Sequence, residues 1–227
     1  SIQYLKGVGE RRAKLLGRLG IADAGDLLRF FPRDYEDFSA VVAIGEAPED
    51  RDVCIRARVL GKPQEHTAKT GMTIYKADVT DGETQMQVTI FNSKYAAAKL
   101  EPGKELLFYG KVKKNFLYTE MNSPQIEEAG PGERIRPVYP LTLGLTSRVI
   151  EKVVASAFEL CAEDLEDTLP ETVRNYYGLL PTLEALRQMH SPADIEKLAE
   201  ARRTLVFEEL LTLQLGLALA GVAAGIV

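Results

Sequence analysis

The stretch "TIYKADVTDGETQMQVTIFNSKYAAAKL", residues 73–100, contains two runs in which apolar and polar residues alternate. A period of two is typical of strands with one buried face. Asp81-Gly82, between the runs, predicts a two-residue hairpin turn. The second run stops at Phe91, and "SKYAAAKL" then has the composition of a short helix. The stretch therefore predicts strand, turn, strand and helix, with one aromatic ring at the strand's exit and Tyr95 on the helix.

The flanking segments extend this pattern to a barrel. "DVCIRARVLG" (52–61) alternates in the same way, and "KELLFYGKVKKNFLYTEMNSPQI" (104–126) is typical of a hairpin that turns near Lys114-Asn115. Five strands with a helix between the third and the fourth is the order of the OB-fold, a small Greek-key barrel that commonly binds oligonucleotides. The predicted class is α+β: an OB barrel flanked by a small N-terminal helical, helix-hairpin-helix-like element and a C-terminal helical connector.

Turn-forming residues and changes in periodicity predict four consecutive segments. These are a helical element over 1–38, the barrel over 39–128, a linker rich in glycine and proline over 129–144, and the helical connector over 145–227.

Helix boundaries are predicted from capping residues and from helix-stopping residues. The first segment predicts a helix that ends at Gly20 and a second helix over Leu27 to Phe31. In the connector, "SPADIEKLAEARRTLVFEELLTLQ" (191–214) predicts a long helix with Ser191 as its N-cap, in a capping box with Asp194.

Residues 210–227 carry no charge. They are barely long enough for a membrane span and lack a basic or aromatic flank. We therefore predict a helix that packs against a domain outside this sequence, and no contact with a membrane. The uncharged tail at 218–227 leaves its continuity with a longer native chain open.

The distribution of charge permits a polyanionic partner in one part of the chain. The net charge of −5 divides into +1 over residues 1–144 and −6 over residues 145–227. Net charge does not reveal local patches. We therefore expect nucleic-acid contacts, if any, in the first two-thirds of the chain, and the acidic remainder is predicted to be a poor partner for a polyanion.

Residues for catalysis or metal binding are sparse. Two cysteines, Cys54 and Cys161, and two histidines, His66 and His190, show no metal-ligand spacing. No phosphate-binding loop, nucleophile elbow or spaced pair of carboxylates is present in the sequence. The sequence predicts no catalytic residue, no metal and no cofactor in this chain. The cysteine content and the absence of a signal-peptide pattern at the N-terminus predict a cytoplasmic protein.

Phe91 and Tyr95 are the strongest candidates for a binding role. Rings at these places could stack on unpaired bases, with Asn92 and Lys94 beside them in contact with the sugar-phosphate backbone. Alternatively, Phe91 closes the bottom of the barrel and Tyr95 half covers it. The residues alone leave both interpretations open.

Two basic groups are further candidates for phosphate contact. "LKGVGERRAKLLGRLGI" (5–21) has the form of a helix-hairpin-helix element with Lys6, Arg11 and Arg12. "GKVKKNF" (110–116) places cations on the predicted hairpin. These are Lys111, Lys113 and Lys114. Packing of the helix-hairpin-helix element on the barrel would explain the first group without DNA. Simple solvation of the lysines at the hairpin tip would explain the second.

Five separated stretches together carry a resemblance to a known family. They are "YLKGVGERRAKLLGRLGI", "DLLRFFPRDYED", "VTIFNSKYAAAKLEPGKELLFYGKVKKN", "IRPVYPLTLGL" and "RRTLVFEELLTLQL". In this order they resemble the amino-terminal part of the RecG family of bacterial ATP-dependent DNA helicases. The resemblance covers most of the chain.

The resemblance implies an OB-fold wedge ahead of a two-lobed helicase motor. In that family the wedge meets the branch of stalled replication forks and Holliday junctions, and an aromatic pair stacks on unpaired bases there. The spacing Phe-x-x-x-Tyr matches Phe91 and Tyr95. The implied partners are branched DNA and motor domains of the same polypeptide, in a monomer, with ATP and Mg²⁺ bound by the motor.

Two rival functions stay open on the sequence alone. A general single-strand-binding OB module would need no branch. A protein-interaction module would use the acidic helices of 145–210 and would keep both rings in the core.

Overall fold

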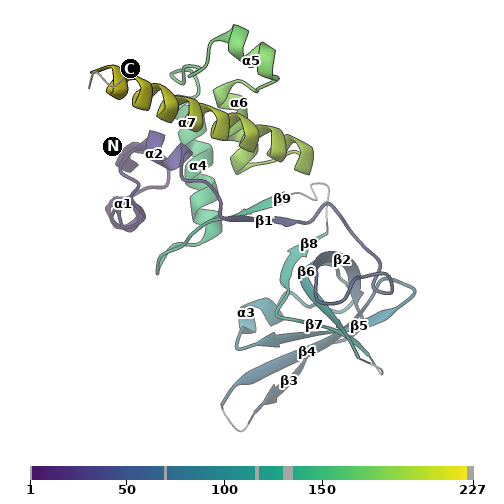
Figure 1. The fold of residues 1–227 in the computed structure, drawn as a ribbon. Helices are drawn as coiled ribbons and strands as arrows, with labels where there is room; N and C mark the ends of the chain where they lie inside the picture. Colours follow the sequence, from purple (N-terminus) through teal and green to yellow (C-terminus); the bar gives the residue numbers. More distant parts are fainter. Residues whose placement is uncertain (1, 69–70, 116–117, 130–134, 224–227) are drawn as a thin grey trace. The chain divides into compact units, whose positions relative to one another are not determined.

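A computed structural model describes residues 2–68, 71–115, 118–129 and 135–223. The chain forms two compact units (Figure 1). The helical unit comprises Ser1–Tyr35 together with Ile135–Val227, and the barrel unit comprises Glu36–Arg134.

The barrel unit is built from strands and one short helix. Its elements are β2 (Asp52–Val59), β3 (Gln64–Thr67), β4 (Thr73–Thr80), β5 (Gln85–Phe91), α3 (Lys94–Ala97), β6 (Glu105–Lys114), β7 (Thr119–Asn122) and β8 (Gln125–Glu128). A separate two-stranded sheet pairs β1 (Asp34–Asp37) with β9 (Ile135–Val138).

Five of these strands close into a ring in the order β2, β4, β5, β7, β6 and back to β2. The closing pair is antiparallel and runs from Asp52 opposite Lys111 to Arg58 opposite Glu105. β5 and β7 are the parallel pair. Along the chain, α3 lies between β5 and β6, the third and fourth of these five strands in sequence order. This is the OB topology, so the predicted fold class is confirmed.

Alternate positions on the strands fill the barrel. On β6, Leu106, Phe108 and Val112 are fully buried, and Val79 and Val88 on β4 and β5 meet them in the same cluster. Because side chains of a strand point alternately to its two faces, the period of two in the sequence gives one apolar wall on each strand. A closed barrel has no hydrogen-bonding edge to protect.

The turn between β4 and β5 is longer than predicted. The last pair of the ladder is Thr80 with Gln85, so four residues form the loop and not two. The Asp81 carboxylate accepts hydrogen bonds from the N–H groups of Glu83, Thr84 and Ile44 at 2.8–3.0 Å. Partial burial alone would raise the pKa of Asp81, but these backbone donors outweigh it and lower that pKa.

The helical unit gathers both ends of the chain. Its elements are the 3-10 turn η1 (Ile2–Tyr4), α1 (Glu10–Gly17), α2 (Ala24–Leu28), α4 (Ser147–Cys161), α5 (Glu171–Tyr177), α6 (Thr182–His190) and α7 (Ile195–Ala223). Leu16 and Leu27 share one buried cluster with Tyr139, Ile150 and Val154.

The four consecutive segments predicted from the sequence differ from this grouping. The N-terminal helices pack with the C-terminal ones in one unit, and the barrel unit extends beyond the predicted 39–128. Part of the predicted linker is structured: residues 135–138 form β9, and Tyr139 is buried. Residues 130–134 of that linker lie outside the described residues. Apolar contacts between distant segments decided the grouping, and composition does not record them.

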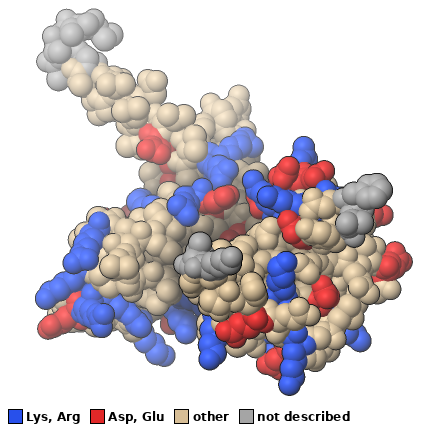
Figure 2. Space-filling view, turned by 90° about the horizontal axis from the view of Figure 1, so that it is seen from below, with Lys and Arg blue, Asp and Glu red and all other residues tan. Residues whose placement is uncertain are grey.

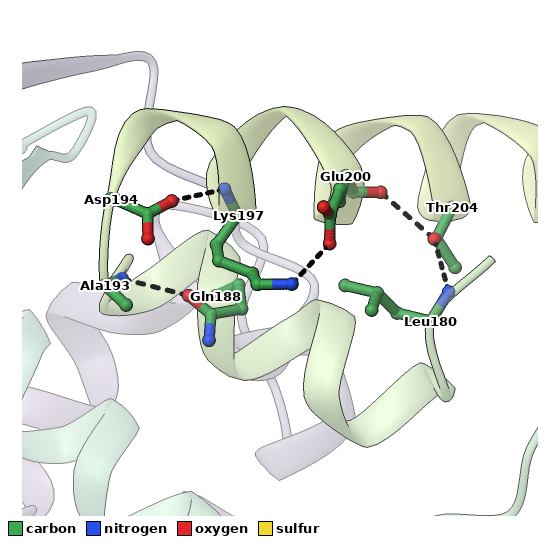
Figure 3. Close-up of polar contacts among 7 residues, drawn as sticks. All are labelled: Leu180, Gln188, Ala193, Asp194, Lys197, Glu200 and Thr204. Carbon is green, nitrogen blue, oxygen red and sulfur yellow. Dashed lines mark hydrogen bonds and ion pairs between the residues drawn. The ribbon is translucent and has the colours of Figure 1, made fainter. Parts of the chain in front are cut away.

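Two predicted helix starts were placed wrongly. The second helix runs over Ala24–Leu28 and not 27–31, because Asp23 and Asp26 form a capping box that starts it earlier. The last long helix begins at Ile195. Asp194, not Ser191, accepts a hydrogen bond from the Lys197 N–H at 2.6 Å (Figure 3).

The uncharged end of α7 is exposed along the part for which side chains are described. Leu210, Leu213, Leu215, Leu217 and Leu219 are each more than half exposed. Residues 224–227 of the predicted uncharged tail lie outside the described residues. Within the described ranges, the structure contains no helix that is both long and apolar enough to cross a bilayer.

His190 joins the two ends of the chain within the helical unit. Its Nε2 lies 2.9 Å from the carbonyl of Leu28, and its Nδ1 lies 2.8 Å from the hydroxyl of Tyr139. A carbonyl can only accept, so Nε2 carries the proton and Nδ1 accepts from Tyr139. Burial lowers the pKa of His190, and the bond to Leu28 opposes that shift. The neutral ring is therefore part of the folded state.

We expect the stability of the chain to fall as the pH drops below about 6.5, the ordinary pKa of histidine in an unfolded chain. The folded state holds the His190 pKa lower, so the unfolded chain binds this proton more readily. Below the unfolded pKa, the free energy of unfolding therefore falls by up to about 1.4 kcal/mol for each pH unit. Urea unfolding at pH 7.5, 6.5 and 5.5 measures the effect. His190→Gln should flatten the dependence, and His66→Gln, at an exposed position on β3, should leave it. Equal slopes in wild type and His190→Gln would contradict the assignment.

Candidate nucleic-acid interface

The turn after β5 fixes where the strand ends. Asn92 has a φ of +52°, a left-handed conformation that asparagine tolerates better than most residues. Its N–H donates to the Thr73 carbonyl at 2.8 Å, and its side-chain oxygen accepts from the Thr73 N–H at 2.9 Å. Ser93 then caps α3 by accepting from the Ala96 N–H at 3.2 Å. Asn92 was predicted as a phosphate contact, and the structure gives it this structural task as well.

Both aromatic rings beside this turn lie outside the barrel core. Phe91 is 37% exposed and Tyr95 is 73% exposed, whereas Phe108 inside the barrel is 0% exposed. Phe91 is the last residue of β5, opposite Ile74, and Tyr95 stands on α3. The alternative in which the rings close the bottom of the barrel therefore does not hold. Two large apolar faces near one strand end remain accessible to a ligand.

Lys99 supports Tyr95 from one side, a role that the sequence pattern did not predict. Its ammonium nitrogen lies over the Tyr95 ring, 5.7 Å from the ring centre, and donates to the Ile126 carbonyl at 2.7 Å. A cation over a ring face is attracted by the ring's negative quadrupole. Tyr95 and Lys99 are four positions apart on the predicted helix, and this spacing was the signal in the sequence that could have indicated their contact. Tyr95 nevertheless remains 73% exposed.

The lysines of β6 are all exposed, but their surroundings differ. Lys111 lies opposite Asp52, and Lys113 lies opposite Glu120 on the paired strand. Lys114 donates to the Gly45 carbonyl at 2.9 Å. The barrel surface visible in Figure 2 likewise carries both signs of charge interspersed. This hairpin is thus less positive than its sequence suggests. Lys94, on α3 next to Tyr95, is exposed.

The three predicted cations of the N-terminal hairpin belong to the helical unit. Lys6, Arg11 and Arg12 are exposed. Arg12 donates to the Gly7 carbonyl at 2.6 Å, and the Lys6 N–H donates to the Ser156 hydroxyl at 3.1 Å. The hairpin loop is therefore held in place, with its cations on the surface.

The described residues offer little for covalent chemistry. Burial, and the nearby Asp37 charge, raise the pKa of the Cys54 thiol to about 12, so it stays protonated at neutral pH. Within the described ranges, no group of three or more His, Cys, Asp or Glu side chains could hold a metal ion. The arrangement of rings and cations suits binding.

Comparisons with known proteins agree with this description. A family model for the RecG wedge domain matches residues 1–160. The chain is 34% identical to the ATP-dependent DNA helicase RecG of Thermotoga maritima, over 94% of this chain and 28% of the relative. It is 32% identical to the RecG of Bacillus subtilis, over 95% of this chain and 31% of the relative. The chain thus spans less than a third of these relatives.

A solved structure extends the similarity to three dimensions. A structure of RecG bound to a three-way DNA junction superposes with a TM-score of 0.76 at 33% identity. The match covers 95% of this chain and 30% of that chain.

Removal of either exposed ring should leave the fold nearly intact. We expect Phe91→Ala and Tyr95→Ala each to lower the free energy of unfolding by no more than about 1 kcal/mol, because neither side chain fills the core. Phe108→Ala, the buried control, should cost about 3–5 kcal/mol. Chemical denaturation followed by circular dichroism measures all three. If Tyr95→Ala destabilised the chain as much as Phe108→Ala does, the ring would have to be part of the core.

Proposed function

The chain belongs to the RecG wedge domain family, and from this premise we propose that it binds branched DNA at stalled replication forks and Holliday junctions. We further propose that the chain helps to split the arms of a branch during recombination and repair. The observation that carries it is the pair of exposed rings, Phe91 and Tyr95, beside a turn held by two hydrogen bonds.

Base stacking is the central step of the proposed mechanism. When a base pair opens at a branch, each base loses a stacked neighbour. Phe91 and the outer face of Tyr95 would replace that neighbour, at about 1–3 kcal/mol per base and nearly independently of base identity. The Lys99 ammonium lies over one face of the Tyr95 ring, so a base would stack on the opposite face.

Phosphate contacts would hold the backbone beside the rings. In the barrel unit, Asn92, Lys94, Lys111, Lys113 and Lys114 are the proposed contacts. We rank Lys94 first, because Lys111 and Lys113 lie opposite carboxylates and Lys114 is bonded to a carbonyl. In the helical unit the proposed contacts are Lys6, Arg11 and Arg12. Such contacts make binding depend on salt concentration.

Energy for strand separation would come from outside this chain. We infer that motor domains of the same polypeptide hydrolyse ATP with Mg²⁺; the relatives' name, ATP-dependent DNA helicase, supports the ATP dependence alone. The 227 residues contain no phosphate-binding loop, so we assign ATP and Mg²⁺ to the proposed motor domains. By itself the chain should bind DNA without unwinding it. We further propose a monomer that acts in the cytoplasm, where its substrate is found.

The exposed rings should contribute to affinity only where bases are unpaired. We expect Phe91→Ala or Tyr95→Ala to weaken binding to a three-way junction about 5- to 150-fold, the equivalent of one lost stacking contact. Binding to blunt duplex should hardly change. Fluorescence anisotropy measures both. Tyr176→Ala, which removes an exposed ring from the helical unit, is the matched control.

A titration with different DNAs separates the proposal from its rivals. We expect tighter binding to forks and junctions than to linear single strands of equal length, because only a branch supplies unpaired bases next to duplex. Equal affinity would favour a general single-strand-binding module. Absence of DNA binding would favour a protein-interaction module and would overturn the proposed function.

A further inference from the structure

A basic cavity of about 430 Å³ lies in the helical unit. One wall is the loop before α1, with Lys6, together with Arg12 in the first turn of α1, and the other is the exposed face of α4, with Arg148 and Lys152. Glu159 is the acidic residue of the lining. The volume of the cavity falls within the range of about 300–1,000 Å³ that is usual for ligand sites.

Contacts between distant segments build this cavity. Arg148, Lys152 and Ser156 recur every four residues on α4 and so share one face of the helix. The Ser156 hydroxyl accepts from the Lys6 N–H at 3.1 Å, which ties the N-terminal loop to α4 across 150 positions of sequence. The bond from Arg12 to the Gly7 carbonyl fixes the same loop from the other side. The two walls are thus held in place without a ligand.

The lining carries four cations and one carboxylate, in a chain whose net charge is −5. Figure 2 shows Lys and Arg side chains gathered at the left of the view, where the helices near the N-terminus lie in Figure 1, with few acidic groups among them. A concave surface of one sign concentrates the field and attracts a polyanion. Residues 145–227 have a negative net charge, so the sequence gave no sign of a basic site on α4.

We propose that this cavity is a second DNA site, which holds a backbone phosphate of a duplex arm by means of Arg148 and Lys152 together with Lys6 and Arg12. The inference rests on the proposed DNA-binding function and assigns duplex contact to the helical unit. The lining contains no aromatic residue on which a base could stack. It therefore favours a phosphodiester backbone over a nucleotide, although both carry the same phosphate chemistry.

The test removes the two α4 cations. Arg148→Ala with Lys152→Ala should weaken binding of the whole chain to blunt duplex and to a three-way junction by a similar factor. The slope of log affinity against log salt concentration should become shallower by about one to two, since each lost phosphate contact removes about 0.9 from the slope. Anisotropy titrations between about 50 and 200 mM salt measure both quantities.

The matched control is Lys197→Ala with Arg202→Ala, which removes the same charge from α7 in the same unit, where Arg202 is exposed and Lys197 is half-buried and paired with Glu200. It should leave the salt slope close to that of the wild type. Unfolding midpoints check that both double variants remain folded. An unchanged slope in the α4 variant, or an equal change in the control, would overturn the second site.

Two further arms separate the possible outcomes. Titration calorimetry with inorganic phosphate and with AMP tests the other source of the same chemistry. Tight binding of either one that depends on Arg148 and Lys152, with DNA affinity unaffected, would show a small-anion site and would contradict the inference. If the wild type binds no branched DNA, the proposed function fails first. If it binds and the α4 variant binds equally well, only the second site fails.

Discussion

The paired hydrogen bonds between Asn92 and Thr73 are the constraint on which the proposed interface depends. They lie where β5 leaves the closed barrel, and the left-handed backbone of Asn92 turns the chain there into α3. Val88 and Ile90 on β5 point into the core, so the alternation of the strand places Phe91 on the opposite, outer face. Because the strand ends there and Ser93 starts α3, Tyr95 stands on the helix that directly follows, and the barrel carries two accessible rings near one strand end. Lys99 then limits Tyr95 to one open face.

Local patterns in the sequence predicted the fold well, and contacts between distant residues set the limits. Alternation on β2, β4 and β5 reflects burial of one strand face, which each strand records in its own residues. Helix starts were less predictable, because Ser191 and Asp194 are both good caps and the sequence alone did not show that Asp194 takes this place. The grouping of both chain ends in one unit depends on pairs such as Leu28 with His190, 162 positions apart. No local pattern encodes such a pair.

The candidate site shows the same division. The rings were identified from their place at a strand's exit, but their exposure could only come from the fold. The three β6 lysines looked equivalent in sequence. In the fold, two of them lie opposite carboxylates and the third donates to Gly45. Conversely, Arg148 and Lys152 stand in an acidic part of the sequence and become part of a basic cavity only when Lys6 is tied to Ser156. Net charge over a segment was therefore a poor guide to where a polyanion could bind.

The most direct measurement of the central idea is fluorescence of 2-aminopurine placed at the branch point of a three-way junction. Stacking of this base on an aromatic side chain changes its emission, so the probe reports contact at the rings and not affinity alone. We predict that wild-type protein at saturation changes the emission of a branch-point probe, and that the variant lacking both Phe91 and Tyr95 rings, also at saturation, does not. The same emission from wild type and variant, each fully bound, would show that the rings do not meet the unpaired bases.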